Sequence, residues 1–115
     1  MSRKLRKRIT AKPKARARVF AALGDKTRLA LVAKLCSGEP RSITKLSEES
    51  KMTRQAITKH LGVLERVGIV SSKQAGRVRL FEFDPEPLEG LREYLESVSK
   101  QWDQTLARLK TYLEQ

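Results

Sequence analysis

The sequence predicts a mainly α-helical protein with one small β-hairpin, an α+β fold. Three observations lead to this prediction. Apolar residues recur at helical spacing between residues 51 and 70, strand-forming residues flank a glycine between 69 and 83, and leucines recur every three or four residues from 86 to 113. At 115 residues the chain is long enough for one small domain, near the size at which a second copy often completes the core.

The charge of the chain is strongly positive and unevenly placed. There are 25 Lys and Arg against 13 Asp and Glu, a net charge of +12. Such an excess points to an acidic partner such as nucleic acid. Residues 1–18 hold nine cations and no acid, residues 51–79 hold seven cations and the single acid Glu65, and residues 85–115 are slightly acidic. The cationic surface is therefore expected on the first segment and on the middle of the chain.

Cysteine usage and hydropathy indicate the compartment. The single cysteine, Cys36, cannot form an internal disulfide, which fits a reducing environment. No apolar run approaches the length of a membrane span, and no signal-like apolar stretch follows the basic N-terminus. We therefore expect a soluble, cytoplasmic protein with no membrane partner.

Residues 1–14 are predicted to form a disordered basic arm, because cations alternate there with few apolar residues and Pro13 stands near the end. Two roles remain open for this arm. It either only keeps the protein in solution or contacts nucleic acid. The candidate contact residues are Arg3, Lys4, Arg6, Lys7 and Arg8.

Two helices are predicted to follow. The first spans residues 15–23 and ends at Gly24. The second begins after Asp25, whose carboxylate can cap its N-terminus, and stops at Gly38. We expect its cysteine to act as a small apolar residue rather than as a redox or metal-binding group. The predicted buried stripe of this helix consists of Leu29, Val32, Ala33 and Cys36.

A third helix over residues 42–50 is followed by a short turn and a fourth helix near 53–67. Ser42 and Thr53 can cap these two helices, and Gly68 can end the fourth. This is the order of a helix-turn-helix, whose second helix enters the major groove of DNA. The inward residues are expected to be Ile43, Leu46, Ile57, Leu61 and Leu64, with Met52 and Val67 at the ends.

The opposite face of the fourth helix carries amides, hydroxyls and cations and no acid, from Gln55, Thr58, Lys59, Gly62 and Arg66. Such groups reach base edges and phosphates; Gln55 can pair bidentately with adenine and Arg54 with guanine. An ordinary solvated helix face is the alternative, although such faces normally mix both signs of charge. The residues expected to face DNA are Thr53, Arg54, Gln55, Thr58 and Lys59.

Residues 69–83 are predicted to form a two-stranded hairpin, the wing beside this helix. The strands cover residues 69–73 and 78–83, and Gly76 supplies the backbone freedom for a turn over 74–77. The wing residues expected to reach phosphate or the minor groove are Lys73, Arg77 and Arg79.

From Glu86 or Pro87 to Leu113 the sequence predicts one long helix, which sets residues 85–115 apart from the domain of residues 15–84. That domain is too small to cover the whole apolar seam of the helix, so we expect a second copy to cover it and form a homodimer. The alternative is a helix folded back on its own monomer. The seam consists of Leu88, Leu91, Leu95, Val98, Trp102, Leu106, Leu109 and Leu113.

The sequence resembles the ArsR/SmtB family of winged helix-turn-helix transcriptional repressors over about residues 18–84. The run MTRQAITKHLGVLERVGIV is similar to the family's recognition helix, VFAALGDKTRLALVAKL to its opening, and VSSKQAGRVRLFEFD to its β-wing. Arg54 and Gln55 replace a common Gln-Pro or Gln-Ser, and Gly62 replaces a common Lys, so no operator sequence can be carried over. The resemblance implies a C-terminal dimerisation helix and repression from a palindromic promoter site.

Relatives that sense metals use a cysteine pair before the recognition helix, or Asp, His and Glu pairs on the final helix. Here the first location reads SITKLSEES, and the final helix has no histidine. Cys36 and His60 alone have suitable ligand character and cannot form a closed site in one protomer. We therefore predict no metal and no cofactor, a hydrogen-bonded structural role for His60, and membership of a non-metal-sensing branch, whose tail residues 86–115 also resemble.

No phosphate-binding loop, nucleophile elbow or catalytic triad pattern occurs, so no catalytic residue and no enzymatic activity are expected. The leading hypothesis is a homodimeric regulator of transcription, a repressor by family resemblance, that binds double-stranded DNA sequence-specifically. The alternative is a sequence-tolerant architectural nucleic-acid-binding protein whose affinity comes from the basic arm. The sequence identifies no small-molecule effector.

Overall fold

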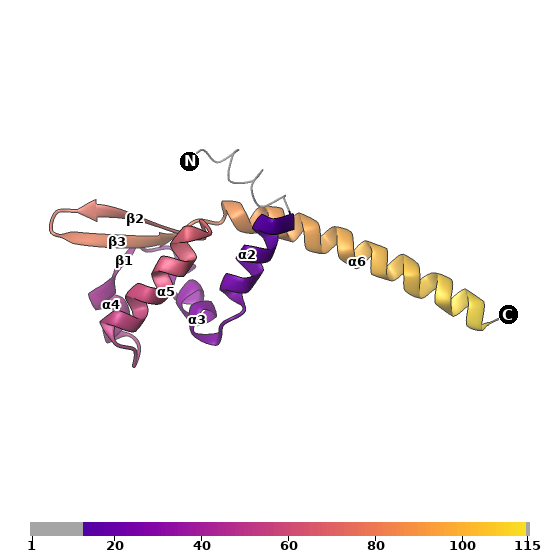
Figure 1. Ribbon diagram of the computed structural model, residues 1–115, viewed down its shortest axis with the longest axis horizontal. Helices are drawn as coiled ribbons and strands as arrows, with labels where there is room; N and C mark the ends of the chain where they lie inside the picture. Colours follow the sequence, from indigo (N-terminus) through magenta and orange to yellow (C-terminus); the bar gives the residue numbers. More distant parts are fainter. Residues whose placement is uncertain (1–12, 115) are drawn as a thin grey trace.

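The computed structural model describes residues 13–114 and shows a small head from which a long C-terminal helix extends (Figure 1). The wing points one way and the long helix the opposite way, which makes the molecule 69 Å long and 33 Å by 22 Å across. The elements in chain order are α2 (Pro13–Leu23), α3 (Lys26–Leu35), β1 (Arg41–Ser42), α4 (Ile43–Glu48), α5 (Arg54–Arg66), β2 (Val70–Ala75), β3 (Val78–Phe83) and α6 (Glu86–Leu113). The predicted α+β winged helix-turn-helix fold is confirmed, and we call α2 to β3 the head.

The core of the head lies where α3, α4 and α5 meet the sheet. Leu46 of α4 and Ile57 and Leu64 of α5 are completely inaccessible to solvent, as is Ile69 before β2. Phe81 on β3 completes this cluster from the sheet. The helix-turn-helix is therefore held together by one shared apolar core, and the inward stripe predicted for α5 is confirmed.

Three helices of the head begin at a side-chain cap. Asp25, Ser42 and Thr53 each accept a hydrogen bond from the backbone N–H of the third following residue, at 2.9, 3.1 and 3.1 Å. These bonds satisfy backbone donors that the first turn of a helix leaves without a partner. All three predicted caps are confirmed. The first helix, α2, begins at Pro13, two residues before the predicted start, because proline fits the first helical position.

The stripe predicted for α3 is right for Val32 and wrong for Leu29, Ala33 and Cys36. The side chains that enter the core are Leu31 and Leu35, with Val32 beside them, whereas Leu29 is 51% exposed and Ala33 is also exposed. Cys36 is exposed rather than buried. The sequence LALVAKL has apolar residues on every side of a helix, so its periodicity does not select a face, and the larger leucines fill the core.

The sheet has three strands in the order β1-β3-β2, whereas the sequence predicted two. β1 comprises only Arg41 and Ser42, which pair antiparallel with Phe81 and Leu80 of β3. The predicted four-residue turn is also wrong: β2 continues to Ala75, and only two residues separate it from β3. The first of these, Gly76, has φ +65°, as tight hairpin turns require.

The long helix α6 begins and ends as predicted, at Glu86 and Leu113. Its first turns pack on the head, and the rest extends away from it (Figure 1). Within residues 13–114, no helix is both long and apolar enough to cross a membrane.

The observed face of α3 predicts opposite outcomes for two leucine truncations. Leu31→Ala should lower the free energy of unfolding by about 2–5 kcal/mol, because it leaves a cavity in the core. Leu29→Ala should change it by less than about 1 kcal/mol, because that side chain is half exposed. Urea unfolding followed by circular dichroism measures both, and equal losses would contradict this face.

Candidate nucleic-acid interface

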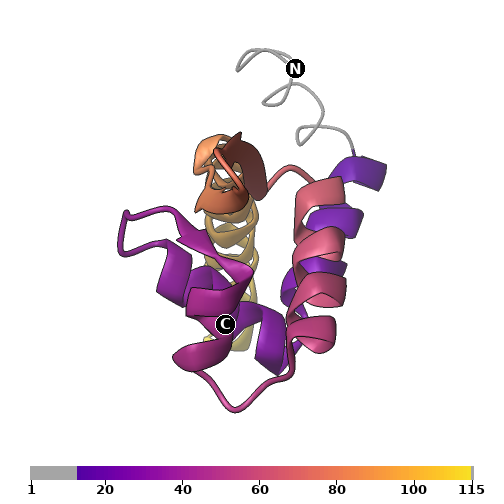
Figure 2. The same cartoon turned by 90° about the vertical axis from the view of Figure 1, so that its left-hand side faces the viewer.

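The α5 helix forms one side of the head when the molecule is viewed along α6 (Figure 2). Its inward stripe is buried against α3, α4 and β2, which leaves the opposite stripe accessible. All five candidate base-facing residues are exposed at or near its N-terminal end: Thr53, Arg54, Gln55, Thr58 and Lys59. The structure therefore brings the predicted residues together on one accessible surface, which we call the α5 face.

Two details set the chemistry of the α5 face. The Thr58 hydroxyl donates a hydrogen bond to the backbone carbonyl of Arg54 at 2.8 Å, so it presents a methyl group and an acceptor oxygen outward. No atom lies within 4 Å of the position that a Cβ would take at Gly62. No side chain therefore covers the backbone of α5 at Gly62, so another molecule can approach the backbone closely there.

Gly68 ends α5 and starts the wing. Its φ is +83°, and its backbone N–H donates to the carbonyl of Glu65 at 3.1 Å. The next N–H, from Ile69, donates to the carbonyl of Leu64 at 3.1 Å. These two bonds form a Schellman motif, so the predicted stop at Gly68 is confirmed and fixes the direction in which β2 leaves the helix.

The three wing candidates occupy different places on the hairpin. Lys73 lies opposite Leu80, whereas Arg79 lies opposite Gln74, so the two cations point to opposite faces of the hairpin. Arg77 lies in the turn at the tip. All three are exposed, but they do not form one cluster.

Arg79 takes part in a polar bridge that the sequence did not reveal. Its guanidinium donates to the Ser72 hydroxyl at 2.8 Å, and that hydroxyl donates to the carboxylate of Glu65 at 2.8 Å. Glu65, the single acid of residues 51–79, therefore holds the wing against α5. Arg79 positions the wing as well as adding positive charge.

A second polar cluster surrounds Glu49, at the end of α4. Its carboxylate contacts Arg41 at 2.5 Å and Lys45 at 3.8 Å, and Lys34 donates to its backbone carbonyl. Each such exposed pair is worth less than about 1 kcal/mol, so the cluster orients the turn between α4 and α5 more than it stabilises the head. Sequence reasoning missed it because its members come from three different elements.

The residues considered as metal ligands lie apart. Among the residues that the structure describes, no group of three or more His, Cys, Asp or Glu could hold a metal ion. His60 lies with its Nδ1 3.5 Å from the guanidinium of Arg28, a hydrogen-bond contact of the kind predicted for it. Although Cys36 is exposed, desolvation by the surrounding protein raises the pKa of its thiol, which disfavours the reactive thiolate.

The seam of α6 divides into two parts. Leu88 and Leu91 pack on the head; Leu91 is only 4% exposed and belongs to the core of its own protomer, and Val98 is half-buried. Trp102 is 61% exposed. The other exposed seam residues are Leu95, Leu106, Leu109 and Leu113.

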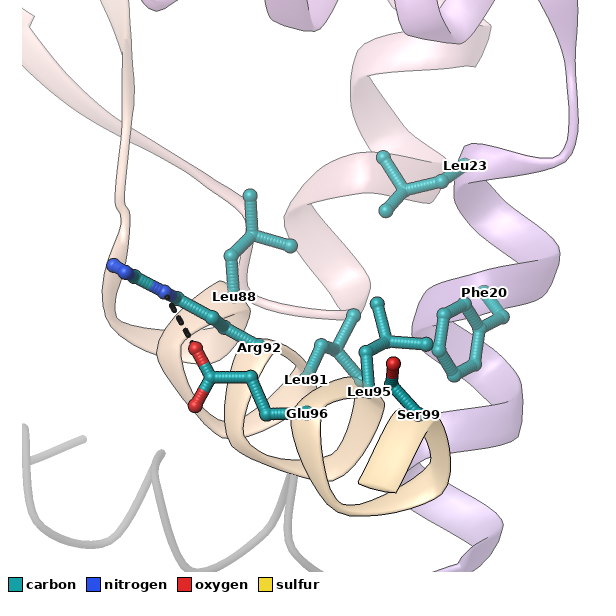
Figure 3. Close-up of a pocket in the computed structure, with 8 residues that line it drawn as sticks. All are labelled: Phe20, Leu23, Leu88, Leu91, Arg92, Leu95, Glu96 and Ser99. Atoms are coloured by element: carbon teal, nitrogen blue, oxygen red, sulfur yellow. Dashed lines mark hydrogen bonds and ion pairs between the residues drawn. The ribbon is translucent and has the colours of Figure 1, made fainter. Parts of the chain in front are cut away.

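An apolar groove of about 450 Å³ lies where α6 leaves the head (Figure 3). One wall is α2, which contributes Phe20 and Leu23, and the other is the first half of α6. Arg92 and Glu96 form an ion pair at 3.3 Å on its rim. The arm candidates, residues 3–8, lie outside the described residues.

Comparisons with known proteins agree with this architecture. A family model described as a helix-turn-helix domain matches residues 14–72. The HTH-type transcriptional regulator YuzN of Bacillus subtilis is 39% identical over 79 residues, 64% of this chain and 86% of the relative. The HTH-type transcriptional regulator Rv2034 of Mycobacterium tuberculosis is 35% identical over 69% of this chain and 73% of its own.

Solved structures show the same fold. An ArsR-like transcriptional regulator from Rhodococcus superposes with a TM-score of 0.80 at 34% identity, covering 88% of this chain and 92% of the other. A homodimeric winged helix-turn-helix DNA-binding domain from Mycobacterium bovis superposes with a TM-score of 0.62 at 22% identity, covering 76% and 81%.

The cap at Asp25 predicts a pH dependence. The hydrogen bond from the backbone N–H of Arg28 lowers the pKa of this carboxyl. Its contribution to stability is therefore present above the ordinary carboxyl pKa of about 3.9 and is lost as the pH falls through the lower folded-state value. Asp25→Asn retains a cap that does not titrate. The free energy of unfolding of the wild type relative to Asp25→Asn, measured in urea, should fall between pH 7 and pH 2.5. A difference that stays constant would contradict the charged cap.

Proposed function

The chain belongs to the ArsR family of winged helix-turn-helix DNA-binding transcriptional regulators, and from this premise we propose that it is a homodimeric repressor of a palindromic promoter site. The α5 face carries the proposal. It is exposed, it lies at the N-terminal end of the second helix of the helix-turn-helix, and it has no acidic residue. Side chains at this end of a recognition helix contact base edges in the major groove.

Each element has a proposed role on DNA. Arg54 and Gln55 read base edges, because guanidinium and amide groups pair bidentately with guanine and adenine. Thr53, Thr58 and Lys59 contact neighbouring bases or phosphates. On the wing, Lys73 and Arg77 neutralise backbone phosphates, while Arg79 supports the wing from its bridge to Ser72.

A second copy of the chain is the proposed cover for the seam of α6. Two α6 helices in an antiparallel pair centred near Lys100 would oppose Leu91 to Leu109, Leu95 to Leu106, and Val98 to Trp102 of the other copy. The exposed end of each helix would then lie over the groove beside α2 of the other. The same pairing sets the first half of α6, with four Glu and the single cation Arg92, against a second half that holds Lys100, Arg108 and Lys110 with the single acid Asp103. The Mycobacterium bovis domain of the same fold is a homodimer.

The pairing also gives a spacing that suits DNA. Leu91 and Leu109 are eighteen residues apart. At 1.5 Å per residue, the two heads would be separated by about 27 Å along the helix pair at the level of Leu91. Successive major grooves on one side of DNA are about 34 Å apart, a distance of the same order. A dimer bound to such a site would repress by excluding polymerase from the promoter.

A second candidate function is sequence-tolerant architectural binding, which is favoured by the nine cations of residues 1–18. In that case charge alone would set the affinity, and the affinities for an operator and for random DNA would be equal. The ratio of those two affinities discriminates between the functions.

Two exposed substitutions test the roles of the helix and the wing. Gln55→Ala should weaken binding to the operator by about 1–3 kcal/mol and relax the base preference at one position. Lys73→Ala should weaken binding to all sequences alike and reduce the salt slope by about one. Fluorescence anisotropy against operator and scrambled duplexes at several salt concentrations measures both effects. Identical profiles for the two variants would argue against base reading by α5.

Negative charges introduced into the apolar seam of α6 test the proposed dimer. The double variant Leu106→Glu and Leu109→Glu should sediment as a monomer, because the carboxylates would be buried against the other copy. Gln104→Glu, exposed on the opposite side of α6, should remain dimeric. A helix folded back on its own monomer is contradicted by the structure, because α6 extends away from the head. Equal masses for the wild type, the double variant and Gln104→Glu would therefore contradict the dimer.

A further inference from the structure

Arg28 joins three helices of the head. It lies in the first turn of α3, where its backbone N–H binds the cap Asp25 at 2.9 Å. Its Nε donates to the carbonyl of Ala22 at 2.6 Å, and a terminal nitrogen lies 3.4 Å from the carbonyl of Ala21. These carbonyls belong to the last turn of α2, and that of Ala21 also accepts from the backbone N–H of Gly24 at 3.2 Å. The guanidinium therefore holds the end of α2 against the start of α3.

The remaining terminal nitrogen of Arg28 points to α5. It lies 3.5 Å from Nδ1 of His60, which is half-buried between the inward stripe and the solvent. A guanidinium can only donate, so Nδ1 of His60 is the acceptor in this contact. Asp25 is the charged group beside Arg28, whose backbone N–H and positive charge lower the pKa of its carboxyl. A directional polar contact thus connects α2 to the flank of the recognition helix.

The contact between Arg28 and His60 adds a directional restraint on the orientation of α5. Leucine and isoleucine side chains hold α5 against the head by apolar burial, which is non-directional, and hydrogen bonds at the flanks of the helix add directional restraints. Base-edge hydrogen bonds tolerate only a few tenths of an ångström around 2.9 Å. The bridge from Glu65 to Ser72 restrains the other flank of α5, near its C-terminal end. The contact at His60 is the restraint nearer to Gln55 and Lys59.

We propose that Arg28 is a positioning residue for DNA recognition: through His60 it sets the rotation of α5 relative to the end of α2 without touching DNA. The proposal rests on sequence-specific binding by the α5 face. It also links that face to α2, the helix that forms one wall of the groove beside α6.

The test compares two substitutions of His60 with one substitution of Arg28 and one control. His60→Asn keeps an acceptor close to the position of Nδ1, and His60→Phe keeps the ring and removes the acceptor. Each full-length variant is titrated with the duplex selected from a random library and with a scrambled duplex at the same salt. Thermal unfolding checks that each is folded. Arg28→Lys keeps the positive charge and removes the planar fork of donors. Lys26→Ala, on the same helix as Arg28 and exposed, shows the effect of removing a positive charge alone.

His60→Phe and Arg28→Lys should each lower the ratio of specific to scrambled affinity by about two- to thirtyfold. Affinity for the scrambled duplex should stay unchanged in both. His60→Asn should recover most of the wild-type ratio, and Lys26→Ala should weaken both affinities alike. A folded His60→Phe with the wild-type ratio, or a His60→Asn as impaired as His60→Phe, would overturn the proposal. A wild-type ratio of one would instead overturn sequence-specific binding itself, and the positioning role with it.

Discussion

The structure depends on a constraint that acts on one helix: α5 must bury one stripe completely and leave the opposite stripe accessible. Ile57 and Leu64 meet the first requirement by entering a core shared with α3, α4 and the sheet. Gln55 and Lys59 meet the second. The caps at both ends, Thr53 and the Schellman motif at Gly68, fix where the helix starts and how the wing leaves it. Other elements of the head either pack against the inward stripe or restrain its flanks.

Whether a feature could be predicted from the sequence depends on how far apart along the chain its interacting residues lie. The caps at Asp25, Ser42 and Thr53 and the end of α5 were predictable because their partners lie within a few residues. The inward face of α3 was not, because LALVAKL is apolar all round and only the assembled core selects Leu31 and Leu35. The two-residue β1 has no readable period and exists only through its pairing with β3.

The polar contacts of the candidate site show the same division. The sequence identified the exposed residues of α5, because a stretch of polar and cationic residues without acids is recognisable from the residue types alone. The bridge from Glu65 through Ser72 to Arg79, and the contact from Arg28 to His60, join separate elements and carry no sequence signal. As a result, Arg79 was predicted as a DNA contact alone, although it also positions the wing. The periodicity of the sequence predicted a dimer seam along all of α6, whereas Leu88 and Leu91 pack on the head of their own protomer.

The central claim is that the α5 face of a dimer reads a particular DNA sequence. The most direct test is to incubate the purified full-length protein with a randomised DNA library at physiological salt, and to sequence the bound fraction. The account predicts an enriched inverted repeat whose half-sites are about one helical turn apart, because two α5 helices related by a two-fold axis would occupy successive major grooves. Absence of any enriched motif, together with an affinity that collapses as salt rises, would contradict it and assign the binding to the basic charge alone.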